Sequence, residues 1–374
     1  MDALEILSHL PTTTQNRSQH MDTILKKVSM SISAEAPERN LAQLNEAEVL
    51  VKALSDTEES TDEERRLSLA RIHYWMGRMH YYHNDRREAL SYFRRVLAEA
   101  QEVGDEELIA TSSSVIGRVL IHQGYFGQAR QFLVQAISAL ERASNWTEYI
   151  DTVAYLGIVR AGSGEYTAGV EEVQRALETH HLAADAMCHC CLAIMYILGG
   201  DMRQALEEGP AIVSVGEQSG DQLAVYLGYG LRAWAEIRLD HHEEALAYMT
   251  QQQAIAGSLG EERLILDDIF AAIKAEIALK AGRVEEALAL AEEAVAYSQT
   301  VDGKFAEGLA QRVWGQALVA LSPPHWDAAR AHMAASLQAF EAGDILPEMA
   351  LTHQEWALLC RTHQDLPEAL YHLS

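Results

Sequence analysis

A small residue recurs at regular intervals shortly after a turn, and this repeat constrains the fold more than any other feature. The segments NDRREAL (84–90) and GRVEEAL (282–288) are two of its eight instances. The small residues lie 36 to 42 positions apart in the numbering; they are Ala89, Ala129, Gly169, Ala205, Ala245, Ala287, Ala329 and Ala369. Self-similarity at this period predicts a solenoid, in which each unit buries its apolar face on its neighbours.

A second set of small residues lies twelve positions before the first. Every member is Gly or Ala; the set is Gly77, Gly117, Gly157, Ala193, Ala233, Ala275, Ala317 and Ala357. Glycine inside a helix destabilises it by up to about 1 kcal/mol relative to alanine, so its recurrence requires a packing reason. The two sets predict hairpins in which helix A and helix B cross so closely that only small side chains fit between them.

The pattern resembles that of the tetratricopeptide-repeat family over roughly residues 60–374. In the family, a large apolar residue follows the small residue of helix B by four positions. Here that position holds Phe93, Leu133, Val173 and Met249, whereas Gly209 and Ala291 depart from the pattern. The resemblance implies an all-α, right-handed superhelical solenoid of about nine helical hairpins. Its period of about 40 residues is longer than the family's 34, which predicts longer helices.

The first repeat departs from the pattern. Residues 1–60 are predicted to form an N-terminal cap with a degenerate repeat, in which Val28 and Asn40 occupy the two small-residue positions. Residues 61–374 are predicted to form about eight repeats. The helix A of one of these repeats is predicted over residues 261–281. The last helix B, from 366 onward, is short. We therefore expect the chain to be a fragment, or a partner to cover its last unit.

The net charge of the chain argues against some classes of binding partner. The chain carries 55 acidic and 29 basic residues, a formal net charge of −26. Such a surface repels phosphate backbones and anionic lipids, so we expect no nucleic-acid partner and no membrane partner. The N-terminal sequence lacks the features of a secretory signal, and no apolar run reaches the ~18–20 residues that span a bilayer. We expect a cytoplasmic protein.

No catalytic or cofactor-binding motif is present. The segment GSGEYTAG (162–169) is rich in glycine but lacks the lysine and the preceding strand of a phosphate-binding loop, so it predicts a turn between helices. We find no nucleophile elbow and no zinc-binding HExxH sequence. The sequence therefore predicts a non-enzymatic protein without a cofactor.

One cluster has the residue types of a metal site. Cys188 and Cys191 share a helix face, and His180 and His181 precede them. Thiolate and imidazole are ligands for zinc or copper, which keeps a metal- or redox-sensing role as a remote alternative. Cys190 points to another side of the helix, and a free cysteine packs as a small apolar residue. Core packing is the favoured interpretation.

Solenoids bind partners on their inner face, which helix A lines in the tetratricopeptide family. The positions fixed relative to the small residue of helix A give the predicted partner-binding residues: Tyr74, Arg78, Tyr81, Arg118, Ile158, Ile194, Trp234 and Trp314. The lysine and asparagine residues of the family's two-carboxylate clamp are missing, which argues against capture of an acidic C-terminus. For the two tryptophans, packing between long helices is the alternative to anchoring a partner.

A narrower resemblance lies in three segments, over 3–56, 116–137 and 155–177. They are similar to the repeat half of bacterial signalling proteins that join a STAND-type ATPase to a nucleotide cyclase or a transcriptional regulator. The resemblance implies a sensing or regulatory arm that binds a protein, with the ATPase or output domain of the parent protein as one partner. The alternative is a free-standing cytoplasmic receptor for a short peptide.

Overall fold

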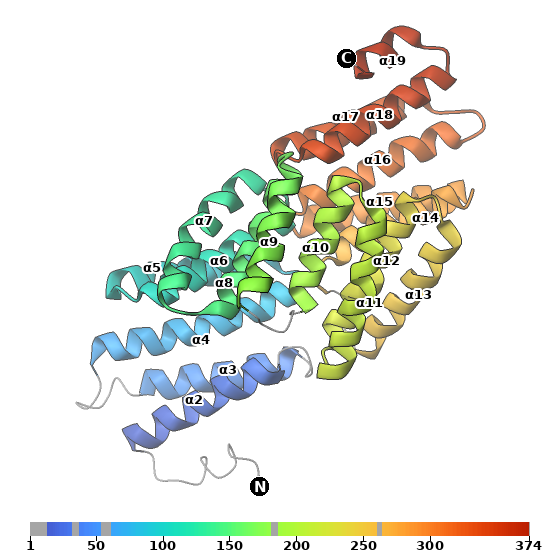
Figure 1. Cartoon of the computed structure of the whole chain (residues 1–374). Helices are drawn as coiled ribbons and strands as arrows, with labels where there is room; N and C mark the ends of the chain where they lie inside the picture. Colours follow the sequence, from blue (N-terminus) through green and yellow to red (C-terminus); the bar gives the residue numbers. More distant parts are fainter. Residues whose placement is uncertain (1–12, 32–36, 54–60, 181–185, 260–263, 374) are drawn as a thin grey trace.

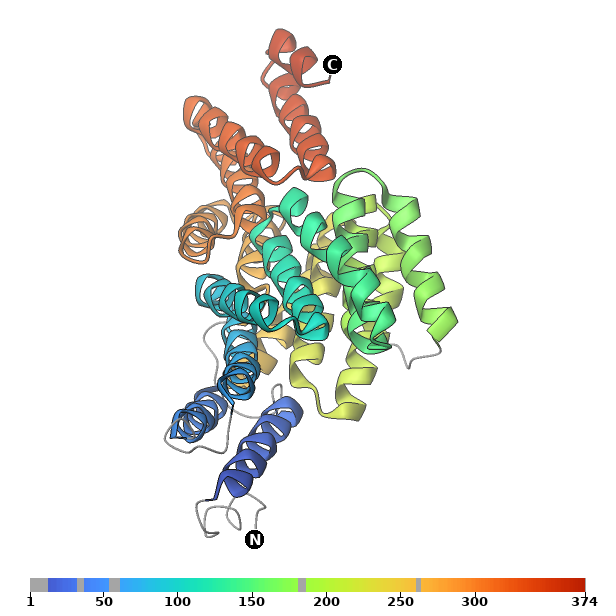
Figure 2. The ribbon, with the colours of Figure 1, turned by 90° about the vertical axis from the view of Figure 1, so that its left-hand side faces the viewer.

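A computed structural model describes residues 13–31, 37–53, 61–180, 186–259 and 264–373. Its eighteen described helices, α2 to α19, pair into nine hairpins that follow one another along the superhelix (Figure 1). The pairs are α2 (Thr14–Ser31) with α3 (Pro37–Lys52), α4 (Asp62–Tyr82) with α5 (Arg86–Val103), α6 (Glu106–Gln123) with α7 (Phe126–Arg142), α8 (Trp146–Gly162) with α9 (Tyr166–His180), α10 (Ala186–Gly199) with α11 (Met202–Ser219), α12 (Gln222–Arg238) with α13 (His242–Ser258), α14 (Asp267–Lys280) with α15 (Val284–Thr300), α16 (Lys304–Ala320) with α17 (Trp326–Ala342), and α18 (Leu346–Thr362) with α19 (Leu366–Leu373). The described ends of the chain lie at opposite ends of the molecule (Figures 1 and 2).

Local sequence sets the limits of many helices. Thr61 and Glu64 form a reciprocal capping box at the start of α4. Further along the chain, Asp105 caps α6 by accepting a hydrogen bond from the backbone N–H of Leu108. Gly124 ends α6 at a φ of 88°, in the left-handed region where glycine has no steric penalty.

The paired small residues lie where helix A and helix B of one hairpin meet. A Cβ added to Gly77 would lie 2.7 Å from the Phe93 ring, and one added to Gly117 would lie 2.6 Å from Leu133. Phe93 and Leu133 are the large apolar residues of the repeat, and both are fully buried. Each glycine therefore makes room for the large residue of its own hairpin, as the sequence pattern predicts.

We expect Gly117→Ala to lower the free energy of unfolding by about 1–3 kcal/mol, because the added methyl group overpacks the contact with Leu133. Gly257→Ala is the matched control. Gly257 is also helical, but nothing lies within 4 Å of its added Cβ, so this change should raise stability by up to about 1 kcal/mol. Urea unfolding of both variants measures the difference; equal effects would show that the small residues have no packing role.

Successive turns of the superhelix touch each other, so hairpins far apart in sequence are in contact. Arg86, at the start of α5, donates two hydrogen bonds to Asp268 of α14, at 2.9 and 2.7 Å. One hairpin further along each of the two contacting segments, the rings of Phe126 and Phe305 stack with centroids 6.4 Å apart. The backbone N–H of Phe126 also donates to the carbonyl of Gly343, at 3.3 Å. These contacts bury side chains that an open solenoid would expose.

The predicted helix over 261–281 is shorter in the structure, where α14 begins at Asp267. Leu264 and Ile265 form a buried turn before it, and Leu266 has a φ of 65°. The backbone N–H of Ile265 donates to the carbonyl of Tyr82, at 2.9 Å. This segment departs from a helix because its backbone binds the end of α4. Residues 260–263 lie outside the described ranges.

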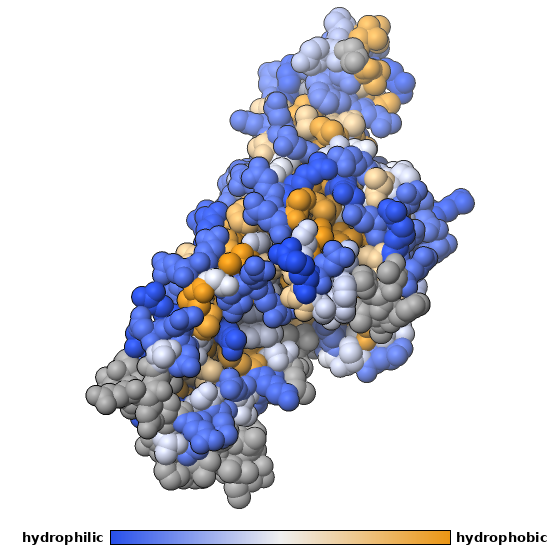
Figure 3. Space-filling model, turned by 60° about the vertical axis from the view of Figure 1, so that its left-hand side comes forward, coloured by the Kyte–Doolittle hydropathy of each residue, from blue (hydrophilic) through white to orange (hydrophobic). Residues whose placement is uncertain are grey.

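Among the described residues, six of the nine large apolar side chains that are exposed belong to the C-terminal hairpin of α18 and α19. Leu366, Leu370, Tyr371 and Leu373 of α19 are each more than half exposed. Figure 3 shows apolar atoms at this upper end of the molecule. Within the described ranges, no helix has both the length and the apolar character needed to cross a bilayer.

Candidate functional site

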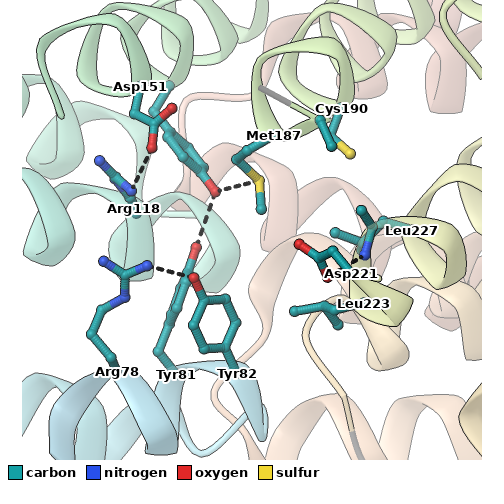
Figure 4. Close-up of a pocket in the computed structure, with 13 residues that line it drawn as sticks. Arg78, Tyr81, Tyr82, Arg118, Asp151, Met187, Cys190, Asp221, Leu223 and Leu227 are labelled. Carbon is teal, nitrogen blue, oxygen red and sulfur yellow. Dashed lines mark hydrogen bonds and ion pairs between the residues drawn. The ribbon is translucent and has the colours of Figure 1, made fainter. Parts of the chain in front are cut away.

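The inner face of the superhelix contains a polar cavity of about 120 Å³ (Figure 4). Side chains from α4, α6, α8, α10 and the start of α12 line it, so five successive hairpins each contribute through helix A. The volume equals that of roughly four water molecules at about 30 Å³ each. The cavity can therefore hold one side chain or terminal group of a ligand, and the rest of the ligand would lie outside it.

Arg118 of α6 is held firmly by acidic neighbours. Its guanidinium donates to Asp151 at 3.3 Å, to Ser114 at 3.2 Å and to Glu148, and the residue is 3% exposed. Burial alone would lower the pKa of Arg118, but Glu148 and Asp151 outweigh burial and hold it above its usual value. The two terminal nitrogens of Arg118 are therefore occupied by protein partners, and only its Nε has none.

Arg78 of α4 differs from Arg118 in its partners. It donates to the hydroxyl groups of Tyr74, at 3.0 Å, and of Tyr82, and the described residues place no carboxylate within hydrogen-bond distance of it. Its guanidinium lies 5.2 Å from the centroid of the Tyr82 ring. Its Nε is buried without a hydrogen-bond partner. Arg78 is thus a cation at the cavity wall whose charge is not neutralised by direct contact.

Three side chains form a hydrogen-bonded chain along the adjacent wall. The hydroxyl groups of Tyr81 and Tyr155 lie 3.2 Å apart, and Tyr155 donates to the Met187 sulfur at 3.2 Å (Figure 4). Burial raises the pKa of both tyrosines, so they stay neutral and act as hydrogen-bonding groups. The wall is therefore polar but uncharged between Arg78 and the opposite side.

Asp221 supplies a carboxylate on that opposite side, at the N-cap of α12, where it accepts from the backbone N–H of Ala224 at 3.1 Å (Figure 4). Leu223 and Leu227 of the same helix add an apolar surface beside it. The cavity thus presents the Arg78 cation and neutral hydroxyl groups on one side, and a carboxylate with an apolar surface on the other. Such a mixture suits a peptide group with one acceptor or acidic end.

Half of the predicted partner-binding residues are brought together here. Arg78, Tyr81 and Arg118 line the cavity, and Tyr74 lies behind Arg78. Ile158, Ile194 and Trp234 line a different space, an apolar one of only about 20 Å³ between the two turns of the superhelix.

Trp234 and Trp314 have different surroundings. Trp234 is fully buried against Phe305, with ring centroids 5.8 Å apart. Trp314 is half-buried and stacks on His332, with centroids 4.1 Å apart. Neither lines the polar cavity. The second turn of the superhelix covers Trp234, so this conformation does not present it to a partner.

The sequence reasoning missed Asp151, Met187 and Leu227. Each lies six positions before the small residue of its helix A, which is Gly157, Ala193 or Ala233 in the three cases. A helical face repeats every three to four residues, so this position belongs to the same face as Arg78 and Arg118. Extending the predicted face by one turn toward the N-terminus would have found them.

The cysteine cluster packs in the core. Cys188, Cys190 and Cys191 are free thiols and at most 2% exposed. Cys188 donates weakly to Asp151, at 3.6 Å, and Cys190 lines the cavity. His181 and the side chain of His180 lie outside the described residues. Within the part of the chain that the structure describes, no three His, Cys, Asp or Glu residues are grouped to hold a metal ion.

His122 is a buried titratable residue next to this site, and we expect it to make stability depend on pH. Its ring stacks on Tyr81 with centroids 5.2 Å apart, and its Nδ1 is buried without a partner. Burial lowers the pKa of His122 well below its usual value of about 6.5, and Arg86 and Arg118 lower it further. Below pH ~6.5 the unfolded chain binds a proton at this residue and the folded chain does not.

The contribution of His122 is therefore complete above pH ~6.5 and lost as the pH falls. From pH 7.5 to 5.5 we expect this residue to remove about 1.4 kcal/mol of stability. The measurement is the pH dependence of urea unfolding for the wild type and for His122→Gln. Parallel pH profiles for the two proteins would show that His122 does not titrate in this way.

Comparisons with known proteins support the fold. No family model matches the chain, and no curated protein matches its sequence. Solved structures do match. The Rap protein complexed with competence and sporulation factor aligns over 95% of this chain and 96% of its own, with a TM-score of 0.66 and 14% identity.

Two further structures have TM-scores of 0.50. Aspartyl phosphate phosphatase F from Bacillus subtilis aligns over 95% of this chain and 92% of its own, with 12% identity. The apo form of the quorum sensor NprR from B. thuringiensis aligns over 90% of each chain, with 14% identity. At these identities the likeness concerns the fold alone. Together with the hairpins and their small-residue contacts, it defines a tetratricopeptide-like helical-repeat protein.

Proposed function

We propose that this protein is a non-catalytic binding module that takes a peptide, or an extended segment of a partner protein, on its inner face. The polar cavity would hold one acidic or carbonyl group of the ligand, with Arg78 as its partner. The observation that carries this proposal is a guanidinium at a cavity wall without a carboxylate in contact. A hydrogen bond to a charged group contributes about 1.5–3 kcal/mol, which raises affinity by roughly tenfold or more.

The shape of the molecule agrees with such a ligand. The cavity lies on the inner face, which is where solenoids bind, and it holds only one group of a larger ligand. The Rap structure of the same fold is a complex with competence and sporulation factor. This match supports a ligand bound to a superhelix of this kind. Cytoplasmic location and the absence of a nucleic-acid or membrane partner belong to the same proposal.

A sensing or regulatory arm of a larger signalling protein is the more specific form of this proposal. It rests on the resemblance of residues 3–56, 116–137 and 155–177 to the repeat half of bacterial signalling proteins that contain a STAND-type ATPase. An ATPase encoded in the same open reading frame, upstream of Met1, would support it. A separate promoter directly before Met1 would favour the free-standing peptide receptor.

Selection from a random peptide library displayed on phage tests the binding proposal. The wild type should enrich related peptides that share an internal acidic residue. Arg78→Gln should fail to enrich them. Arg175→Gln should enrich them as the wild type does, because Arg175 is exposed on the outer helix α9 and donates to the carbonyl of Glu171 in its own helix. Enrichment of the same peptides by Arg78→Gln would contradict the assignment.

A further inference from the structure

A second cavity lies where α18 crosses the ends of α10, α12 and α14. Its volume is about 350 Å³, within the usual range of small-ligand pockets. It is separate from the polar cavity of the inner face and shares no lining residue with it. Three carboxylates reach it, from Glu276, Glu348 and Glu355.

Two of these carboxylates already have cationic partners. Glu348 is 3% exposed and pairs with Arg238 at 2.9 Å and with Arg312 at 2.7 Å. Glu355 pairs with Arg312 at 3.3 Å. Each guanidinium group therefore pairs with at least one carboxylate, while Nε and Nη1 of Arg238 have no hydrogen-bond partner among the described residues.

Glu276 is the third carboxylate, and it has no such partner. It lines the cavity and is 6% exposed, yet it forms no hydrogen bond or ion pair with any residue in the described ranges. Lys280, one turn later on α14, lies at the rim and pairs with Asp240 instead, at 3.3 Å. A carboxylate that lines a cavity without an ion-pair partner can accept hydrogen bonds from a cationic group placed beside it.

Among the described residues, Glu276 is therefore the one of these three carboxylates that no cation contacts directly, although Arg238 lies near enough to act on it electrostatically. Burial raises the pKa of Glu355; Arg312 opposes this effect, and Glu276 adds to it. The neighbouring walls are apolar and include Leu198, Ile237 and Leu351. An occupant that matches both properties has a cationic head for Glu276 and an aliphatic stem for these walls.

We propose that this cavity binds the primary ammonium group of an aliphatic amine, with the Glu276 carboxylate as its partner. A lysine side chain of a protein partner and a free aliphatic diamine both carry this group. A compact ammonium with a flexible stem is favoured over guanidinium because the apolar walls lie beside a single unpaired carboxylate. The strongly acidic chain would also draw cationic ligands toward the site.

Calorimetric titration of the full chain with hexylamine tests the proposal, with 1-hexanol as the neutral probe of matched stem. We expect saturable binding of hexylamine that is at least tenfold tighter than that of hexanol. Glu276→Gln should weaken hexylamine at least tenfold. Glu285→Gln, which removes an exposed carboxylate of α15, should leave the affinity unchanged and thus controls for general charge attraction.

A variant with an expected gain separates binding from folding defects. Lys280→Ala removes the ammonium group that lines this cavity one helical turn after Glu276, on the same face of α14. It should tighten hexylamine binding. The proposal is overturned if hexanol binds as well as hexylamine, if Glu276→Gln binds like the wild type, or if Glu285→Gln loses as much affinity as Glu276→Gln.

The source of the ammonium is resolved with two further probes. Lysine blocked at its α-amino and carboxyl groups represents a protein side chain, and 1,5-diaminopentane represents a free diamine. Tighter binding of either one, lost in Glu276→Gln, supports the site and identifies its source. Failure of both to bind overturns the proposal.

Discussion

Asp268→Ala should lower the free energy of unfolding by about 3–5 kcal/mol, because it leaves Arg86 as an unpaired charge in the interior. Arg86 is 1% exposed and Asp268 is fully buried, and their two hydrogen bonds join α5 to α14 across 182 residues. Asn84 adds a third hydrogen bond to Asp268, at 3.2 Å. The loss should therefore separate the two turns of the superhelix as well as destabilise the hairpins.

Two control variants show whether the loss in Asp268→Ala comes from the buried position of the ion pair. Glu165→Ala breaks an exposed pair with Arg130, where the expected loss is below about 1 kcal/mol. The double variant Arg86→Met with Asp268→Leu removes both charges and should recover most of the lost stability. Urea unfolding of the four proteins measures these differences. If Asp268→Ala loses no more than Glu165→Ala, the contact between the turns does not hold the fold together.

Trp234→Ala should lower stability by about 3–5 kcal/mol, the usual effect of truncating a buried aromatic side chain. Trp234 is fully buried and touches Phe305 across the two turns of the superhelix, with ring centroids 5.8 Å apart. The small apolar space beside it cannot collapse easily, because Phe126 and Ile269 are already packed around it.

Trp314→Ala is the comparison for this residue, and its effect should be smaller. Trp314 is half-buried and stacks on His332. Thermal unfolding, with binding of a selected peptide measured in parallel, separates the two roles of a tryptophan in a solenoid. A Trp234→Ala protein that is as stable as the wild type but binds the peptide poorly would show that Trp234 is a ligand anchor instead of a core residue.

Much of the hairpin architecture could be predicted from sequence because it depends on local contacts. Gly77 and Phe93 belong to one hairpin, and their spacing in the sequence fixes their contact. The contact between the two turns of the superhelix depends on the small rotation between successive hairpins. This rotation adds up over five hairpins, and no local sequence pattern indicates it. Arg86 and Asp268 are therefore unremarkable in the sequence, and Ile265 could be read as part of a helix.

The same reasoning explains the predicted partner-binding residues. Arg78, Tyr81 and Arg118 lie on the inner face of the first turn, where helix A geometry alone determines what they line. Trp234 lies on the same face of its own helix, but the second turn packs over it. A face can be predicted from helical spacing, whereas what covers it depends on contacts between distant hairpins.

The binding of a selected peptide to Arg78→Gln tests the central claim most directly. Calorimetry should show affinity at least tenfold below that of the wild type, equivalent to about 1.4 kcal/mol. Arg175→Gln should bind like the wild type, and unfolding curves should show that both variants are folded. Wild-type affinity in a folded Arg78→Gln protein would contradict the claim that the polar cavity of the inner face anchors the ligand.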